Sequence, residues 1–145
     1  MKQSTENPTI NVNKRNFFPK NERLYLQKDI EKLFTSGQTF ISYPLRIVYL
    51  PVSKAESGFS ILVSVSKKRI KHAVERNRIK RFIREAYRLN KNIPAALCKQ
   101  KEKHFHVAFL YQCNDMKTYS DIEKAMQKAF KMIQVRCSLD KNAMQ

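Results

Sequence analysis

The segment from residue 67 to residue 88 is unusually rich in positive charge. It holds ten lysine and arginine side chains against two glutamates, set among apolar residues. Guanidinium groups bind phosphate through paired hydrogen bonds, and ammonium groups bind it as point charges. The chemistry that this segment offers is therefore binding of a phosphate-rich polymer. The residues predicted to do this are Lys67, Lys68, Arg76, Asn77, Arg78, Lys80, Arg81, Arg84 and Arg88.

The spacing within this segment predicts a helix with two different faces. At about 100° per residue, the apolar positions fall on one side and the basic positions on the other. The apolar side consists of Ile79, Phe82, Ile83 and Ala86. Like charges four residues apart destabilise a helix by a few tenths of a kcal/mol per pair. An ordinary solvated face is the alternative, but such a face mixes both signs of charge. The pattern favours a helix that lies along a sugar–phosphate backbone.

The charge of the whole chain supports a polyanionic partner. The 145 residues include 29 basic and 12 acidic side chains, a net charge of +17. Nucleic acid or an anionic membrane could neutralise this excess. No apolar run approaches the roughly 20 residues of a spanning helix, and the N-terminal stretch has no apolar core of a signal peptide. Cys98, Cys113 and Cys137 are odd in number and far apart, which fits reduced thiols. We therefore expect a cytoplasmic protein that binds nucleic acid and no membrane.

The elements that must position the basic helix can be placed from periodicity. Residues 1–17 read as a flexible polar arm and 137–145 as a C-terminal tail. A helix is expected over 28–37, stopped by Gly37, and strands over 45–52, 59–66 and 104–111. The first two strands are expected to form an antiparallel pair. A capping box at Ser120–Glu123 begins a final helix. This order predicts an α+β fold, a two-layer α/β sandwich with one mainly antiparallel sheet packed by helices.

The sequence predicts no catalytic residue and no metal site in the protein. A metal-dependent nuclease needs clustered carboxylates, whereas the acids here are scattered along the chain. One alternative is a metal held by His104 and His106 together with Cys98 or Cys113. No ligand spacing of a known zinc module accompanies these residues.

Three blocks of residues closely resemble the signature of the bacterial ribonuclease P protein component. They are Val65-Ser66-Lys67-Lys68, the run AVERNRIKR at 73–81 with its Arg-Asn-Arg core, and Arg84-Glu85. The resemblance implies a family domain over 18–136. It also implies a left-handed strand–helix–strand crossover, as in the ribosomal protein S5 domain 2-like fold.

The resemblance also implies a function. In this family the protein does not cut RNA; it assists a catalytic RNA that uses Mg²⁺, held mainly by the RNA, to remove the 5′ leader of precursor tRNA. The implied partners are the catalytic RNA and precursor tRNA, with the protein present as a monomer. The Arg-Asn-Arg helix would contact the catalytic RNA. The single-stranded leader would lie in a cleft with Phe34, Tyr49 and Ser64.

The chain departs from the family pattern at two places. Ile30 stands where many members have phenylalanine. Leu62 and the segment 69–72 stand where many have glycines, so that the basic helix begins after bulkier residues. Two other functions remain as alternatives: a ribosome-associated or general RNA-binding module, and a DNA-binding protein whose basic helix enters the major groove.

Overall fold

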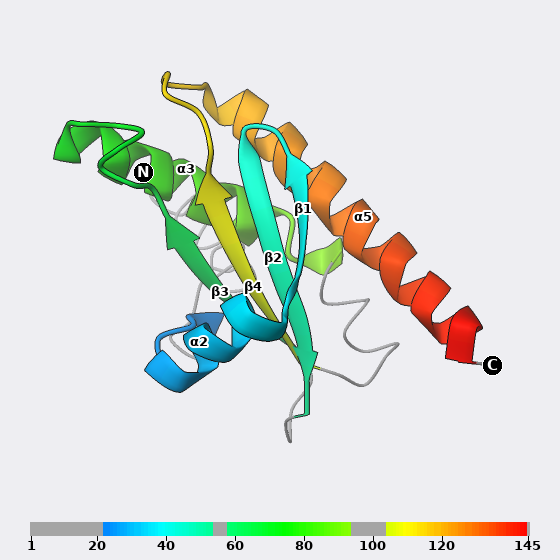
Figure 1. The fold of residues 1–145 in the computed structure, drawn as a ribbon. Helices are drawn as coiled ribbons and strands as arrows, with labels where there is room; N and C mark the ends of the chain where they lie inside the picture. Colours follow the sequence, from blue (N-terminus) through cyan, green and yellow to red (C-terminus); the bar gives the residue numbers. More distant parts are fainter. Residues whose placement is uncertain (1–21, 54–57, 94–103, 145) are drawn as a thin grey trace, which may run out of the picture.

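Strand β4 (His104–Tyr111) lies in the interior of a four-stranded sheet, although it is the last strand in the chain. The other strands are β1 (Gln38–Ser42), β2 (Leu45–Val52) and β3 (Gly58–Ser64), and the order across the sheet is β1-β2-β4-β3. The computed structural model describes residues 22–53, 58–93 and 104–144 (Figure 1). The arm predicted over 1–17 lies outside the described residues.

The pairing of the strands differs from the sequence prediction at one point. β1 pairs with β2, and β2 with β4, in antiparallel fashion, whereas β3 runs parallel to β4. The predicted antiparallel pair of 45–52 with 59–66 is therefore wrong, because β4 lies between these two strands. A parallel pair requires a crossover, and helix α3 (Ala73–Leu89) supplies it. In Figure 1, α3 passes behind the sheet and the chain returns in β4 to the right of β3, which is the left-handed crossover.

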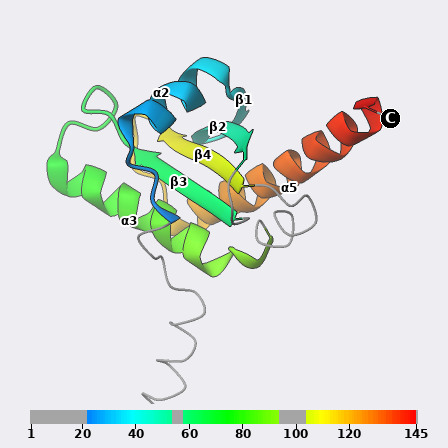
Figure 2. The same ribbon diagram turned by 90° about the horizontal axis from the view of Figure 1, so that it is seen from below.

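Helices cover both faces of the sheet. Helices α3 and α5 (Tyr119–Met144) pack on one face, and α2 (Gln27–Ser36) packs on the other (Figure 2). The larger core lies between the sheet and the α3/α5 layer. The apolar stripe of α5 is buried there in full: Ile122, Ala125, Met126, Ala129 and Ile133. The fold is the predicted α+β class.

A smaller core lies under α2. Leu33 of α2 is fully buried against Val48 of β2 and Ala108 of β4, together with Leu24 from the segment before the helix. Along β2, alternate residues point to opposite faces, so Val48 faces α2 while its neighbours Ile47 and Tyr49 face the larger core.

The start of α5 differs from the predicted position. Thr118 Oγ1 accepts the Asp121 N–H at 3.2 Å, and the Asp121 carboxylate accepts the Thr118 N–H at 3.3 Å. This capping box begins two residues before the predicted Ser120–Glu123 box. Glu123 instead accepts hydrogen bonds from Asn90 and Tyr119. The helix continues to Met144, and the boundary between domain and tail at 136 stays a prediction.

Gly37 ends α2, as predicted, but for a steric reason. Its backbone is extended, with φ −74° and ψ 159°, and its N–H donates to the Leu33 carbonyl at 2.8 Å. A Cβ at this position would lie 2.3 Å from the Leu33 carbonyl oxygen and 3.0 Å from that of Tyr49. Glycine is needed here because a side chain would overlap the Leu33 carbonyl at the end of the helix and would also crowd β2.

We expect Gly37→Ala to lower the free energy of unfolding by about 1–3 kcal/mol, because the new methyl group overlaps backbone atoms that cannot move freely. Urea denaturation measures this change. Ser36→Ala, at the neighbouring exposed position, is the control and should stay within about 0.5 kcal/mol of the original protein. Equal stability of the two variants would contradict the close-approach explanation.

Candidate nucleic-acid interface

Helix α3 is held in place by its apolar face. Ile79, Ile83, Ala86 and Tyr87 are buried against the sheet and α5. Phe82 is half-buried at the flank, where its ring packs edge-on against Tyr119 of α5 with centroids 5.9 Å apart. The apolar positions predicted from helical spacing therefore do form the contact side. This packing leaves the opposite side of the helix to solvent.

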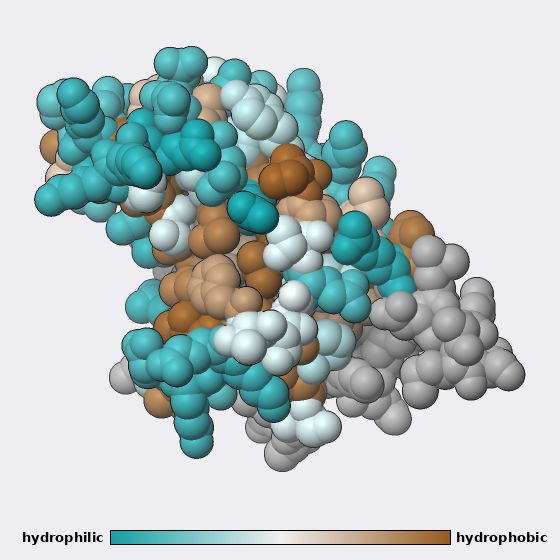
Figure 3. Space-filling view, viewed as in Figure 1, coloured by the Kyte–Doolittle hydropathy of each residue, from teal (hydrophilic) through white to brown (hydrophobic). Residues whose placement is uncertain are grey.

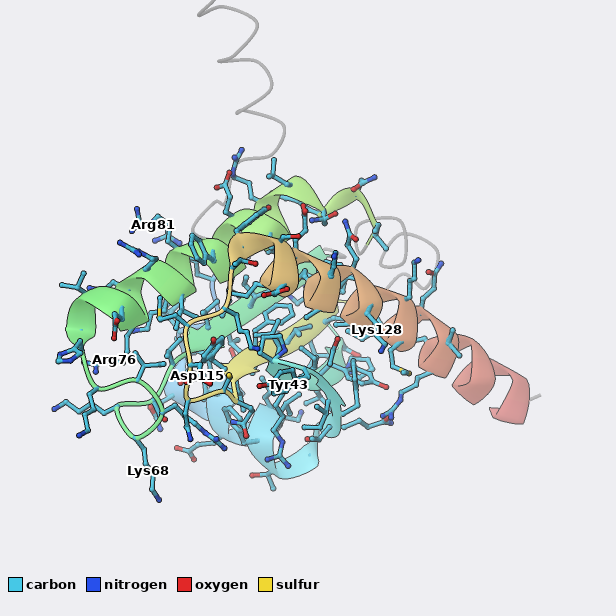
Figure 4. All side chains as sticks on the ribbon, turned by 90° about the horizontal axis from the view of Figure 1, so that it is seen from above. Tyr43, Lys68, Arg76, Arg81, Asp115 and Lys128 are labelled. Carbon is cyan, nitrogen blue, oxygen red and sulfur yellow. The ribbon has the colours of Figure 1, made fainter. Side chains whose placement is uncertain are left out.

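The exposed side carries the basic arc, which we define as Asn77, Arg78, Arg81 and Arg84. Within the described part of the chain, none of their side chains makes an ion pair or a hydrogen bond. Arg81 points outward from α3 in Figure 4. The basic arc is therefore a set of hydrogen-bond donors on a rigid helix that have no partner among the described residues.

The other predicted residues of α3 are less available. Lys80 is half-buried beside the arc. Arg88 is also half-buried and forms an ion pair with Glu85, one turn earlier. This hydrogen-bonded pair raises the pKa of the Arg88 guanidinium. Part of the positive charge at the C-terminal end of α3 is therefore balanced within the helix.

Arg76 has a structural role that the sequence did not reveal. Its Nη1 donates to the carbonyl oxygens of Ile70 at 2.9 Å and Lys71 at 2.7 Å. These residues belong to the connecting loop, residues 66–72, between β3 and α3. Arg76 thus joins the first turn of the helix to the loop before it and is only partly exposed.

The connecting loop is anchored at two further places. Ile70 is buried in the larger core, and Arg69 donates to Gln112 and Asn114 at 3.3 and 3.4 Å. The residues of this segment thereby make contacts of their own. The anchoring leaves Lys67 and Lys68 exposed before the helix, where the positive end of the helix dipole also favours anions.

A row of side chains on the α2 side of the sheet is not covered by the helix. Strand register places these residues side by side, one from each strand: Ile41, Arg46, Leu110 and Ser64. Ile41, Arg46 and Ser64 are exposed and Leu110 is half-buried. We call these four residues the open row. Figure 3 shows apolar surface over the strands, bordered by hydrophilic side chains over α2 and over the start of α3.

The structure separates the three residues predicted for the leader cleft. Ser64 lies in the open row, and Phe34 is 47% exposed on α2. Tyr49 must be corrected: it is 1% exposed and lies in the larger core on the opposite face of the sheet. Its hydroxyl donates to Gln38 at 2.9 Å. Its ring therefore cannot stack on a base at the α2 face.

A pocket that was not predicted from the sequence lies beside the basic arc. Arg84 lines it together with Arg23, Leu24, Tyr25 and residues 61–63 of β3, and its volume is about 430 Å³. The Leu24 N–H donates to the Ile61 carbonyl at 2.8 Å, so this segment lies along the outer edge of β3. The pocket joins the basic arc to the edge of the sheet. The mixture of basic, apolar and aromatic residues at 23–25 is the signal that could have drawn attention to it.

Among the residues that the structure describes, no three His, Cys, Asp or Glu side chains come together as metal ligands. His104 lies 2.7 Å from the Ser60 hydroxyl, and Cys98 is outside the described residues. No helix in the described ranges is long and apolar enough to cross a membrane.

Comparison with known proteins gives the family. A family profile described as ribonuclease P matches residues 18–134. The chain belongs to the ribonuclease P protein family. It is similar to the ribonuclease P protein component of Porphyromonas gingivalis, with 42% identity over 111 residues that cover 76% of this chain and 81% of that protein.

The ribonuclease P fold is also found among solved structures. The RNase P protein from Thermotoga maritima aligns with a TM-score of 0.61 at 20% identity, covering 77% of this chain and 96% of that one. A mutant RNase P protein of Staphylococcus aureus aligns with a TM-score of 0.63 at 19% identity, covering 92% and 98%. These likenesses confirm the fold class.

We expect Arg76→Ala to lower the free energy of unfolding by about 1–3 kcal/mol, because the carbonyls of residues 70 and 71 lose a charged donor. Arg81→Ala removes the same charge from the basic arc and should leave stability within about 0.5 kcal/mol. Thermal or urea denaturation compares the two. If both variants are as stable as the original protein, Arg76 does not anchor the connecting loop.

Proposed function

We infer that the chain acts as the protein subunit of ribonuclease P, which removes the 5′ leader from precursor tRNA. Membership of the ribonuclease P family supports this role. The structural observation that carries it is the basic arc: four exposed donors on one rigid helix, with no acidic partner among the described residues. A helix of this kind suits RNA binding by charge and by hydrogen bonds to phosphate.

The proposal assigns the basic arc to the catalytic RNA. Lys67 and Lys68, exposed on the anchored loop, extend the arc toward the start of α3. The side chain of Asn77, in the middle of the arc, can donate to and accept from a ribose hydroxyl or a base edge. Arg76 contributes mainly by fixing the loop that carries the two lysines.

The proposal assigns the open row to the single-stranded leader. An exposed sheet surface with an arginine, a serine and apolar side chains can contact the bases and phosphates of single-stranded RNA. Arg46 supplies the charge and Ser64 a small hydroxyl, while Phe34 on α2 offers an exposed ring. Tyr49 has no part in this surface.

The chemistry is assigned to the RNA. Mg²⁺ prefers hard oxygen ligands and commonly binds phosphates together with water, so the proposal places it mainly on the RNA. The protein lowers the electrostatic cost of bringing two RNAs together by neutralising phosphates. We propose one protein copy in each ribonucleoprotein, acting in the cytoplasm.

Cleavage of 5′-labelled precursor tRNA at low Mg²⁺ tests the function. We expect no cleavage by the protein alone, slow cleavage by a bacterial catalytic RNA alone, and fast cleavage at the mature 5′ end by the mixture. Failure to stimulate a cognate catalytic RNA would overturn the proposal. Salt-sensitive binding to RNA in general, without stimulation, would indicate a general RNA-binding module, and a preference for duplex DNA would indicate a DNA-binding protein.

The double variant Arg78→Ala/Arg81→Ala tests the assignment of the basic arc. Binding of the catalytic RNA should weaken, and the slope of log affinity against log salt should become shallower by about two, one for each lost phosphate contact. Lys28→Ala/Lys131→Ala is the matched control, since it removes two exposed charges from other helices. An equal loss in the control would show that net charge alone, and not the arc, determines the affinity.

A further inference from the structure

A second basic pocket lies between the β1–β2 turn and α5, away from the basic arc. The turn contributes Ser42, Tyr43 and Pro44, and the pocket has a volume of about 340 Å³. α5 and the segment before it contribute Lys117, Asp121, Lys124, Ala125 and Lys128. Figure 4 shows Tyr43 and Lys128 beside α5, whereas Arg76 and Arg81 lie along α3.

Tyr43 offers an exposed aromatic ring in a fixed position. The side chain is 60% exposed, yet its hydroxyl donates to Cys113 Sγ at 3.1 Å. This hydrogen bond to the Cys113 sulfur raises the pKa of Tyr43. Lys117 Nζ lies 5.4 Å from the ring centroid. A held, solvent-facing ring with an adjacent cation is a surface on which a nucleobase can stack.

The lysines of the pocket are free to meet an anion. Lys124 and Lys128 are exposed and lie one turn apart on α5. Neither they nor Lys117 forms an ion pair within the described residues. The single carboxylate of the pocket, Asp121, is held by the Thr118 N–H in the helix cap. Three lysines against one aspartate leave the pocket with a net positive charge.

The pocket continues the open row. Ile41 in that row pairs with Arg46, and the chain then runs through Ser42 directly into Tyr43. The Ser42 hydroxyl donates to the Ala125 carbonyl at 2.8 Å, which ties the end of β1 to α5. RNA that leaves the open row past Ile41 would pass around the end of β1 to reach the Tyr43 ring and the lysines on the α5 side of the sheet.

We propose that Tyr43, Lys117, Lys124 and Lys128 form a second RNA-binding site, which holds a nucleotide of the 5′ leader beyond the open row. Tyr43 stacks on the base, and the lysines bind the phosphodiester backbone. Because stacking and point charges do not read base edges, the site accepts any leader sequence. The inference rests on the proposed function, and it makes substrate affinity depend on leader length.

The test compares precursor tRNAs that share one tRNA body and carry leaders shortened stepwise. The assembled ribonucleoprotein binds each of them under conditions that block cleavage. With long leaders, Tyr43→Ala should weaken binding about tenfold, as expected for loss of one stacked base. Tyr43→Phe keeps the ring and should bind like the original protein. With leaders that end within the open row, all three proteins should bind equally.

Lys128→Glu and Lys131→Glu form a matched pair on α5, because both lysines are exposed and only Lys128 lines the pocket. Only Lys128→Glu should weaken binding of long leaders. If both substitutions weaken binding equally, the effect comes from the net charge of α5, and the proposed site is wrong.

Two further readouts separate this inference from the proposed function. The affinity of each variant for the catalytic RNA should be unchanged, and so should cleavage of short-leader substrate. If these are normal and long-leader binding is also unchanged in Tyr43→Ala, the site is wrong while the proposed function stands. Weaker binding of the catalytic RNA would assign the pocket to that RNA instead and overturn the leader site. If the original protein does not stimulate cleavage at all, the proposed function fails and the site fails with it.

Discussion

Burial of the apolar face of α3 is the interaction on which the rest of the molecule depends. Lys80, Arg84 and Arg88 repeat every four residues, and repulsion of this kind costs an isolated helix a few tenths of a kcal/mol per pair. Full burial of Ile79 or Ile83 contributes about 1.5–3 kcal/mol each, several times more. Packing therefore outweighs repulsion, and the basic arc can stay unpaired in the free protein. The same packing fixes the arc relative to the sheet.

Much of the fold can be predicted from local periodicity, but the pairing of the strands cannot. The alternation in 104–111 and the helical spacing in 73–88 gave the correct faces, because each face is decided by burial of nearby residues. The neighbour of β2 could not be found in this way, since register depends on contacts between distant segments. The left-handed crossover came from the family resemblance alone. β1, only five residues long, gave no clear alternation and was not predicted.

The residues of the candidate site were predictable from the sequence to different degrees. Charge and spacing identified the exposed arginines of α3, but not Arg76's bonds to backbone carbonyls, which require a particular loop path. Tyr49 was placed in the cleft by resemblance, although its alternation with Leu45 and Ile47 already put it on the face of the larger core. Tyr43 and Lys128 are far apart in sequence and share a pocket only because Ser42 ties β1 to α5. No local sequence pattern indicates that two such distant residues share a pocket.

The position of β4 in the sheet affects how the chain folds. β4 bonds to both β2 and β3, so a chain synthesised only as far as residue 103 has a β1–β2 hairpin and a separate β3 with nothing between them. Isolated hairpins are marginal in water, and the apolar faces of these strands stay open until the final third of the chain has emerged. Folding then requires long-range contacts to form together, which is slow and exposes strand edges meanwhile. The sheet that carries the open row therefore cannot be completed until β4 has been synthesised.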